Sequence, residues 1–263
     1  MQSDFYSQEG DDFWNIPQKS GSLHPNIELP GSKSLTNREL VLSALADSPS
    51  ELVAPLDSRD SQLMIQALTE LGAKINSVET KGNLVIVPVT TDIEVNTEID
   101  CGIAGTVMRF VPPVAGLLTG QIRFDGDPAA RQRPMQTTID SLRQLGVEVS
   151  NQDGRLPFTV TASGSIKGGY LEIDASASSQ FLSALLLIAP STEIGITAKH
   201  VGGALPSMPH IDMTVQMLRD FGAEVQVDKK ANTWRIEPGK LTAQDLIIEP
   251  DLSNAAPFMS IAM

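Results

Sequence analysis

The feature that most constrains the fold of this chain is an internal repeat with a period of about 75 residues. Three segments share a helix-like pattern that is closed by glycine and followed at once by a β-type run: 67–75, 141–149 and 217–225. Their glycines, Gly72, Gly146 and Gly222, lie 74 and 76 residues apart. A glycine directly after a helix is typical of a left-handed C-cap. The chain is therefore predicted to contain three copies of one structural unit.

A second recurring pattern places an aspartate before a helix of small and apolar residues. Asp100, Asp174 and Asp251 open three such segments, and the helix after Ser32 is a fourth relative. Each unit is predicted to hold a strand, an apolar helix, a strand, an amphipathic helix and two strands. Residues 181–189 are apolar nearly all round, which indicates a central helix. We expect an α/β fold of three βαβαββ repeats, with inner helices surrounded by sheets and outer helices facing solvent.

The repeat also suggests how the chain is divided. We expect a flexible acidic leader over 1–26, a three-repeat lobe over 27–247, and the start of a second lobe over 248–263. The leader has no basic residue before Lys19, unlike a signal or transit peptide. The helix opened by Asp251 is cut after about a dozen residues, so we expect a piece of a longer protein. The alternative is that this helix is a short terminal cap.

Composition narrows the function classes. The net charge of −13 argues against nucleic acid or an anionic membrane as the main partner, although a few clustered cations still allow a small anionic ligand. The single cysteine, Cys101, excludes an internal disulfide and indicates a reducing compartment. No apolar run approaches the roughly 20 residues of a membrane span. We therefore expect a cytoplasmic protein, with a monomer as the default.

No motif in the chain indicates a metal or a cofactor. The three histidines form no spaced ligand set, and there is neither a nucleophilic triad nor a dinucleotide fingerprint. We expect no metal and no cofactor.

Residues 30–38 form the first of five candidate anion-binding segments. Lys33, Ser34 and Arg38 lie at a predicted helix start, where N–H groups and the helix dipole favour an anion. Pro30-Gly31 is typical of a close backbone approach. The alternative is a helix start whose two cations are merely solvated.

The second and third segments precede other helices. Gly105 and Thr106 open an inner helix, which favours either an anion at the free N–H groups or ordinary capping by Thr106. Arg131 and Arg133 lie in a turn-rich loop over 126–133, which is either a phosphate clamp or a solvated loop.

The fourth and fifth segments supply hydroxyl groups. Ser178, Ser179 and Gln180 begin the most apolar helix, where two hydroxyls need a partner such as a phosphate or serve as a double cap. Ser207 and His210 precede a surface helix. His210 is either a polar contact or a capping and packing residue.

Together these segments closely resemble the EPSP synthase (3-phosphoshikimate 1-carboxyvinyltransferase) family. The resemblance runs from about Ile27 to Met263 and rests on Pro30-Gly-Ser-Lys-Ser-x-x-Asn-Arg38, Ala104-Gly-Thr-x-Met-Arg109, Arg133-Pro134, Ser178-Ser-Gln-Phe181 and Ser207-x-Pro-x-Ile-Asp212. It implies one lobe of the enolpyruvyl transferase fold, an inside-out α/β barrel. It also implies enolpyruvyl transfer from phosphoenolpyruvate to the 5-hydroxyl of shikimate 3-phosphate, in the shikimate pathway of aromatic amino acid biosynthesis.

The resemblance also implies roles for individual residues. The expected shikimate 3-phosphate contacts are Lys33, Ser34, Arg38, Ser178, Ser179, Gln180 and Ser207. The expected phosphoenolpyruvate contacts are Lys33, Gly105 and Arg133, with Thr106, Arg131 and His210 as further candidates.

Two positions depart from the family pattern. Phe110 stands where proline is common, and His210 stands where many members have tyrosine. In the family, the acid and base come from the second lobe, so we expect no catalytic residue in this chain, only substrate binding without turnover.

Two other functions remain open. Related UDP-N-acetylglucosamine enolpyruvyl transferases usually carry a cysteine in the loop that corresponds to 126–133, and this loop has none. A non-catalytic anion-binding module is the alternative of another class.

Overall fold

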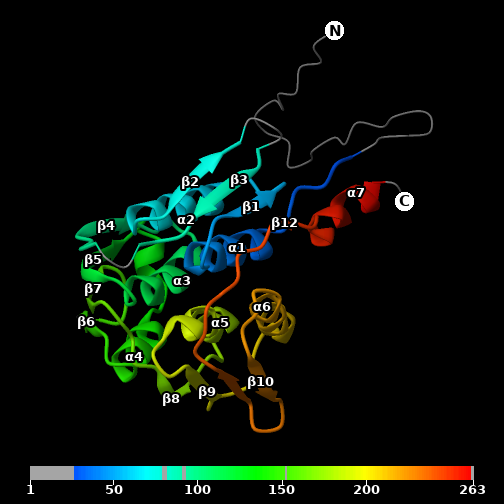
Figure 1. The fold of residues 1–263 in the computed structure, drawn as a ribbon. Helices are drawn as coiled ribbons and strands as arrows, with labels where there is room; N and C mark the ends of the chain where they lie inside the picture. Colours follow the sequence, from blue (N-terminus) through cyan, green and yellow to red (C-terminus); the bar gives the residue numbers. More distant parts are fainter. Residues whose placement is uncertain (1–26, 79–81, 91–92, 152, 262–263) are drawn as a thin grey trace, which may run out of the picture.

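A computed structural model describes residues 27–78, 82–90, 93–151 and 153–261 of the chain. The predicted leader over 1–26 lies outside the described residues. The described residues form three four-stranded sheets, which lie around the helices α1, α3 and α5 (Figure 1). The predicted α/β class is thus confirmed.

The elements follow one order in each of three units. The first unit contains α1 (Lys33–Leu45), β1 (Ser50–Val53), α2 (Arg59–Glu70), β2 (Lys74–Ser77) and β3 (Leu84–Val87). The second contains β4 (Thr97–Asp100), α3 (Gly105–Ala115), β5 (Thr119–Asp125), the 3-10 turn η1 (Ala130–Gln132), α4 (Gln136–Gln144), β6 (Glu148–Ser150) and β7 (Phe158–Ser163). The third contains β8 (Gly169–Ile173), α5 (Ser179–Ile188), η2 (Ala189–Ser191), β9 (Ile196–His200), α6 (Met208–Asp220), β10 (Val225–Asp228) and β11 (Thr233–Ile236). They are followed by β12 (Leu246–Ile247), η3 (Leu252–Ala255) and α7 (Ala256–Ile261).

The three sheets share one topology. Their strand orders are β12-β1-β3-β2, β4-β5-β7-β6 and β8-β9-β11-β10, and the first pair is parallel in each case. In the first sheet the parallel edge strand comes from the far end of the chain, because Leu246 is in register with Leu52. The segment after the third unit therefore completes the first. The division at 27–247 and 248–263 remains a prediction.

The inner and outer helices differ in burial, as the sequence predicts. Nine residues of α5 are buried, whereas α2 buries only Ser61, Met64, Ala67 and Leu68. The inner helix α1 is an exception in composition, because five polar residues are buried on it: Thr36, Asn37, Arg38, Glu39 and Ser43. These side chains need partners or a function, since burying an unpaired polar group is costly.

The repeat glycines adopt the predicted conformation. Gly72, Gly146 and Gly222 directly follow the C-caps of α2, α4 and α6, with φ angles of 102°, 87° and 85°. Only glycine adopts this region at little cost, so these positions end each outer helix.

Two of the three repeat aspartates, Asp100 and Asp174, lie in a turn before the helix and do not begin it, whereas η3 begins directly after Asp251. The Oδ1 of Asp100 accepts from the N–H of Gly102 at 2.8 Å, and that of Asp174 accepts from Ser176 at 2.9 Å. These bonds make a turn between strand and helix, and the helices begin only at Gly105 and Ser179.

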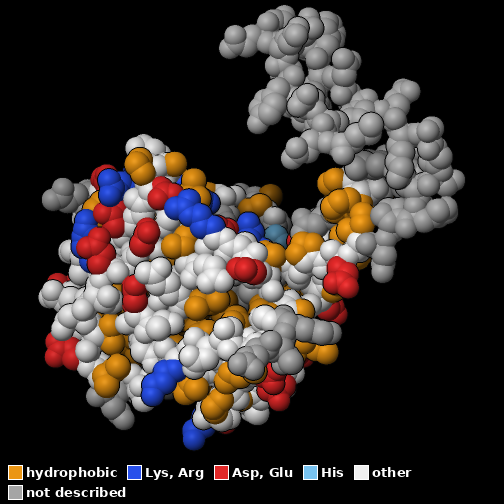
Figure 2. Space-filling model, turned by 90° about the horizontal axis from the view of Figure 1, so that it is seen from above, with side chains coloured by type: hydrophobic (Ala, Val, Ile, Leu, Met, Phe, Trp, Pro, Cys, Tyr) orange, Lys and Arg blue, Asp and Glu red, His pale blue; other side chains and the backbone are white. Residues whose placement is uncertain are grey.

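Hydrophobic side chains gather where the C-terminal helix lies, at the right of Figure 2. On η3 and α7, Leu252, Phe258 and Met259 are 78%, 45% and 66% exposed.

Among the helices that the structure describes, none has the length and hydropathy to cross a membrane.

Glu39 provides a test of the α1 environment. It is 5% exposed and its Oε2 has no hydrogen-bond partner. Burial, followed by the charge of Asp220, raises the pKa of this carboxyl to about 8. The folded state therefore holds a proton on Glu39 that the unfolded chain loses above pH 4.5, so this group lowers stability as the pH rises from 4.5 to 8.

We predict that Glu39→Gln raises the free energy of unfolding by about 3 kcal/mol at pH 7 and by almost nothing at pH 4. Urea unfolding at both pH values measures this difference. The exposed Glu148→Gln serves as the matched control and should change stability little at either pH. A gain that is equal at both pH values would contradict the account.

Candidate functional site

The starts of the helices converge on one place. The Nδ2 of Asn37 on α1 donates to the Oγ1 of Thr106 on α3 at 2.8 Å. Arg38 donates to Thr214 on α6 at 2.7 Å and to Ser183 on α5 at 3.4 Å. Polar side chains thus join the second turn of α1 to the first turn of α3 and to the middle of α5 and α6. Because a helix start carries partial positive charge, this cluster favours an anion.

Arg38 is the most deeply buried cation of the cluster. It is 2% exposed, and it also donates to the carbonyl oxygens of Ser34 and His210, at 3.0 and 3.4 Å. Burial lowers the pKa of its guanidinium to about 10. The alternative of a solvated Arg38 is therefore wrong. The departure at Phe110 has a role here, because the Arg38 guanidinium lies over the Phe110 ring at 5.2 Å.

Lys33 and Ser34 lie at the edge of this cluster. Ser32, not Ser34, is the N-cap of α1. The Lys33 side chain is 53% exposed, and its Nζ lies 3.3 Å from the Oδ2 of Asp60 on α2. Ser34 is half-buried. Gly31 does allow the predicted close approach, but what approaches it is the backbone of Ala54. A Cβ added at Gly31 would lie 2.7 Å from the Ala54 carbonyl oxygen.

The start of α3 carries no side-chain cap. Ala104 is the N-cap, so capping by Thr106 is wrong; Thr106 instead accepts from Asn37. A Cβ on Gly105 would lie 2.9 Å from Arg133 Nη2 and 3.2 Å from both Arg109 Nη1 and Gln180 Oε1. Residues from three separate segments therefore surround the space beside Gly105.

Arg109 is a residue of this site that sequence reasoning did not select. It is 3% exposed, its Nε has no partner, and its guanidinium lies 5.4 Å from the Phe181 ring. Burial, and then the charge of Arg133, lower the pKa of Arg109 to about 10. Its place in Ala104-Gly-Thr-x-Met-Arg109, one turn after Gly105, was the available signal.

The two arginines of the 126–133 loop have different surroundings. Arg131 makes two hydrogen bonds to the carboxylate of Asp125, at 2.8 and 3.0 Å. Arg133 instead donates to the carbonyl of Ile103 at 2.9 Å and lies beside Arg109. The two arginines therefore do not act as the predicted pair. The charge of Arg131 is already balanced by Asp125, whereas Arg133 is directed toward the start of α3.

The start of α5 places Ser178, Ser179 and Gln180 near the same space. Ser178 is the N-cap, and its Oγ accepts from the N–H of Gln180 at 3.2 Å. Ser179 is 4% exposed. Of the three residues, Gln180 is the one that lies near Gly105, since its Oε1 would be 3.2 Å from a Cβ added there.

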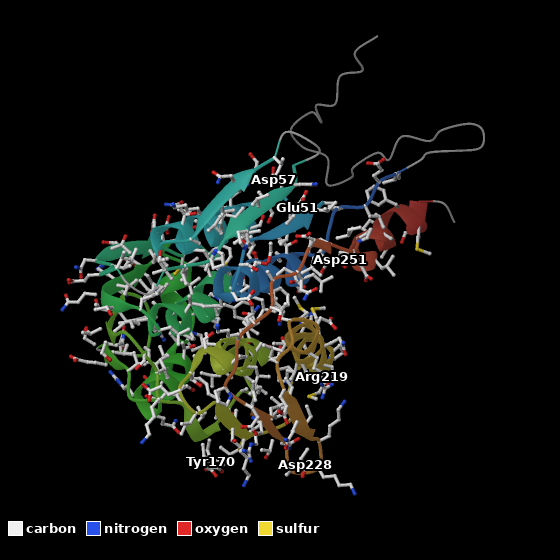
Figure 3. All side chains as sticks on the ribbon, in the orientation of Figure 1. Glu51, Asp57, Tyr170, Arg219, Asp228 and Asp251 are labelled. Atoms are coloured by element: carbon white, nitrogen blue, oxygen red, sulfur yellow. The ribbon has the colours of Figure 1, made fainter. Side chains whose placement is uncertain are left out.

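Ser207 and His210 lie at the start of α6. Ser207 has a left-handed backbone, with φ of 52°, and makes no side-chain cap bond. Burial, and then the charge of Arg38, lower the pKa of the His210 ring, while Asp251 acts in the opposite direction. Asp251 lies between β12 and α7 (Figure 3), so the last described segment of the chain contributes to the charge around His210.

The site has the electrostatics of an anion pocket. Among the described residues, no carboxylate forms an ion pair with Arg38, Arg109 or Arg133. Within the same part of the chain, no three His, Cys, Asp or Glu side chains gather closely enough to hold a metal ion. Cys101 is buried, and burial raises the pKa of its thiol to about 12, which makes it a poor nucleophile at neutral pH.

Comparisons with known proteins support the same interpretation. Residues 17–263 match the family model described as EPSP synthase (3-phosphoshikimate 1-carboxyvinyltransferase). A 3-phosphoshikimate 1-carboxyvinyltransferase of Kocuria rhizophila is 50% identical over 98% of this chain and 60% of its own length. The chain thus spans less than two thirds of this relative.

Solved structures show the same fold. An EPSP synthase from Acinetobacter baumannii matches with a TM-score of 0.76 and 25% identity, over 89% of this chain and 52% of that one. The enolpyruvyl transferase NikO from Streptomyces tendae matches with a TM-score of 0.66 and 17% identity, over 91% and 55%. The predicted enolpyruvyl transferase fold is confirmed.

Arg109 provides a test of the unbalanced charge. We predict that Arg109→Met raises the free energy of unfolding by about 1–2 kcal/mol, because it removes a buried cation that has no carboxylate partner and lies beside Arg133. Chemical denaturation measures this. Arg131→Met is the control, and it should lower stability slightly because it removes one of the two arginines that pair with Asp125. Loss of stability in Arg109→Met would show that its charge is already balanced.

Proposed function

Because the chain belongs to the EPSP synthase family, we propose that it forms the shikimate 3-phosphate side of an enolpyruvyl transferase site. In the proposed reaction, the 5-oxygen of shikimate 3-phosphate bonds to C2 of phosphoenolpyruvate, and the C2–O bond to phosphate breaks. The products are 5-enolpyruvylshikimate 3-phosphate and phosphate. The observation that carries the proposal is the group of three guanidiniums, those of Arg38, Arg109 and Arg133, that form no ion pair with a carboxylate of the described residues and lie near converging helix starts.

The proposed shikimate 3-phosphate contacts come from α1, α5 and α6. Ser178, Ser179 and Ser207 bind the 3-phosphate through hydroxyl and N–H groups, and Gln180 lies against the ring. The absence of a side-chain cap bond at Ser207 supports this role, because its hydroxyl is not used by the helix.

The proposed cations of this subsite are Lys33 and Arg38, with Ser34 beside them. Lys33 exchanges Asp60 for a ligand anion, which its exposed side chain permits. Arg38 keeps its contacts with Ser183 and Thr214 and is thereby held in position for the ligand.

The proposed phosphoenolpyruvate contacts surround Gly105. Arg133 and Lys33 face the anionic groups of this substrate, and we add Arg109 to them. Two adjacent guanidiniums repel each other in a buried place, and an anion with several negative oxygens relieves that repulsion. We give Arg131 no such role because Asp125 already binds it.

Proton transfer is not assigned to any residue of this chain. The reaction needs a base for the 5-hydroxyl and an acid for the methylene carbon of phosphoenolpyruvate. We therefore propose that this chain binds substrate without turnover by itself. We further propose a cytoplasmic monomer, a location supported by the single, buried cysteine.

Calorimetric titration of shikimate 3-phosphate tests the phosphate subsite. We predict that Ser178→Ala/Ser179→Ala weakens binding at least about tenfold, because both hydroxyls at the start of α5 are lost. The titration is run on this 263-residue chain and on the protein expressed from the complete gene. Ser150→Ala, on an exposed position of β6, is the control and should bind normally. Unchanged affinity in the double variant of the complete protein would reject this placement.

Gly105→Ala tests the phosphoenolpyruvate subsite. The added Cβ would crowd Arg133, Arg109 and Gln180, so we predict that KM for phosphoenolpyruvate rises about tenfold in the protein from the complete gene. KM for shikimate 3-phosphate should change much less. Gly239→Ala, where the added Cβ meets nothing within 4 Å, is the matched control. Equal rises in both KM values would contradict the assignment.

A further inference from the structure

Two loops of the candidate site cross in direct backbone contact. The loop over 101–104 leads from β4 into α3, and the loop over 126–133 leads from β5 toward α4. The N–H of Asp127 donates to the carbonyl of Gly102 at 2.9 Å. A Cβ on Gly126 would lie 2.6 Å from that same carbonyl oxygen, so a side chain does not fit there. The relative position of the two loops is therefore set at this crossing.

Arg59, the first residue of α2, lies against the crossing. Its Nη2 is 2.8 Å from the Oδ2 of Asp127, and a Cβ on Gly102 would lie 3.1 Å from the same Nη2. One side chain thus contacts both loops. The Arg59 and Asp127 side chains are 60% and 36% exposed.

The α2 helix itself does not need this arginine. Ser58 and Ser61 already form a capping box at its start. A cation in the first turn is unfavourable because it meets the positive end of the helix dipole. The position of Arg59 is therefore explained by its contact outside α2.

Asp127 connects Arg59 to Arg133. The carbonyl of Asp127 accepts from the N–H groups of Ala130 and Arg131, at 2.8 and 3.2 Å. These bonds form the turn η1, whose C-cap is Arg133. The Nη1 of Arg133 donates to the carbonyl of Ile103 at 2.9 Å, beside the start of α3. A shift of Asp127 would therefore move Arg133 relative to Gly105.

We propose that Arg59 is a positioning residue, which acts through Asp127 to hold Arg133 against the start of α3 for phosphoenolpyruvate binding. This inference rests on the proposed function, because Arg59 itself contacts no substrate and acts only through Arg133. An exposed ion pair contributes little to stability. Its effect is geometric, and small misplacements of binding groups are costly in catalysis.

The test uses steady-state kinetics of the protein expressed from the complete gene. Arg59→Gln is expected to raise KM for phosphoenolpyruvate about tenfold, and to leave KM for shikimate 3-phosphate within about twofold. The melting temperature should stay unchanged. Asp127→Asn should show the same pattern. In the double variant, KM for phosphoenolpyruvate should be no higher than in either single variant, because both substitutions remove the same ion pair. Arg59→Lys, which keeps the charge, should recover part of the loss.

Arg235→Gln is the matched control. Arg235 lies on β11, is 57% exposed and pairs with Glu237 at 2.6 Å, so its loss removes a similar ion pair away from the site. The inference is overturned if Arg59→Gln behaves like this control, if both KM values rise together with a lower melting temperature, or if the two single effects add. If the wild-type protein neither binds nor converts the two substrates, the proposed function fails and this inference fails with it.

Discussion

The burial of α1, α3 and α5 among three sheets is the constraint on which the rest of the structure depends. Each inner helix is enclosed, so its polar first turn has to find partners at the end of the lobe where the helix begins. The bond between Asn37 and Thr106, and the approach of Gln180 to Gly105, show that these ends meet. A repeat that buries one helix from each unit thus creates one site from three units.

The same repeat explains why distant parts of the chain are joined. Between Ile27 and α1 the structure describes no strand, and β12 pairs in parallel with β1 at the position that β4 and β8 occupy in the other two sheets. Next to this pair, the N–H of Ser32 donates to the carbonyl of Glu249 at 2.9 Å. The N-cap of α1 is therefore held by a segment more than 200 residues later in the sequence, and the position of Lys33 and Ser34 depends on that late segment.

The site is positively charged, although the whole chain is acidic. The net charge is −13, yet Arg38, Arg109 and Arg133 have carbonyl, hydroxyl and aromatic partners in place of carboxylates. Burial of a cation without a counter-charge costs stability, and the large apolar core offsets that cost. Such a site is suited to an anion, which is consistent with the proposed binding of two phosphorylated substrates.

The sequence by itself determined the repeat, the α/β class, the left-handed glycines and most of the residues at the helix starts, because these depend on local pattern and on spacing. Tertiary structure alone decided which cations are available. Arg131 and Arg133 are equivalent in the sequence, but Asp125 binds the first and leaves the second beside Arg109. Likewise, periodicity did not indicate that Arg38 is buried, since its partners Thr214 and Ser183 lie 176 and 145 residues away in the sequence. Spacing along the chain predicts which residues begin a helix, but charge balance depends on contacts between segments that only the folded chain brings together.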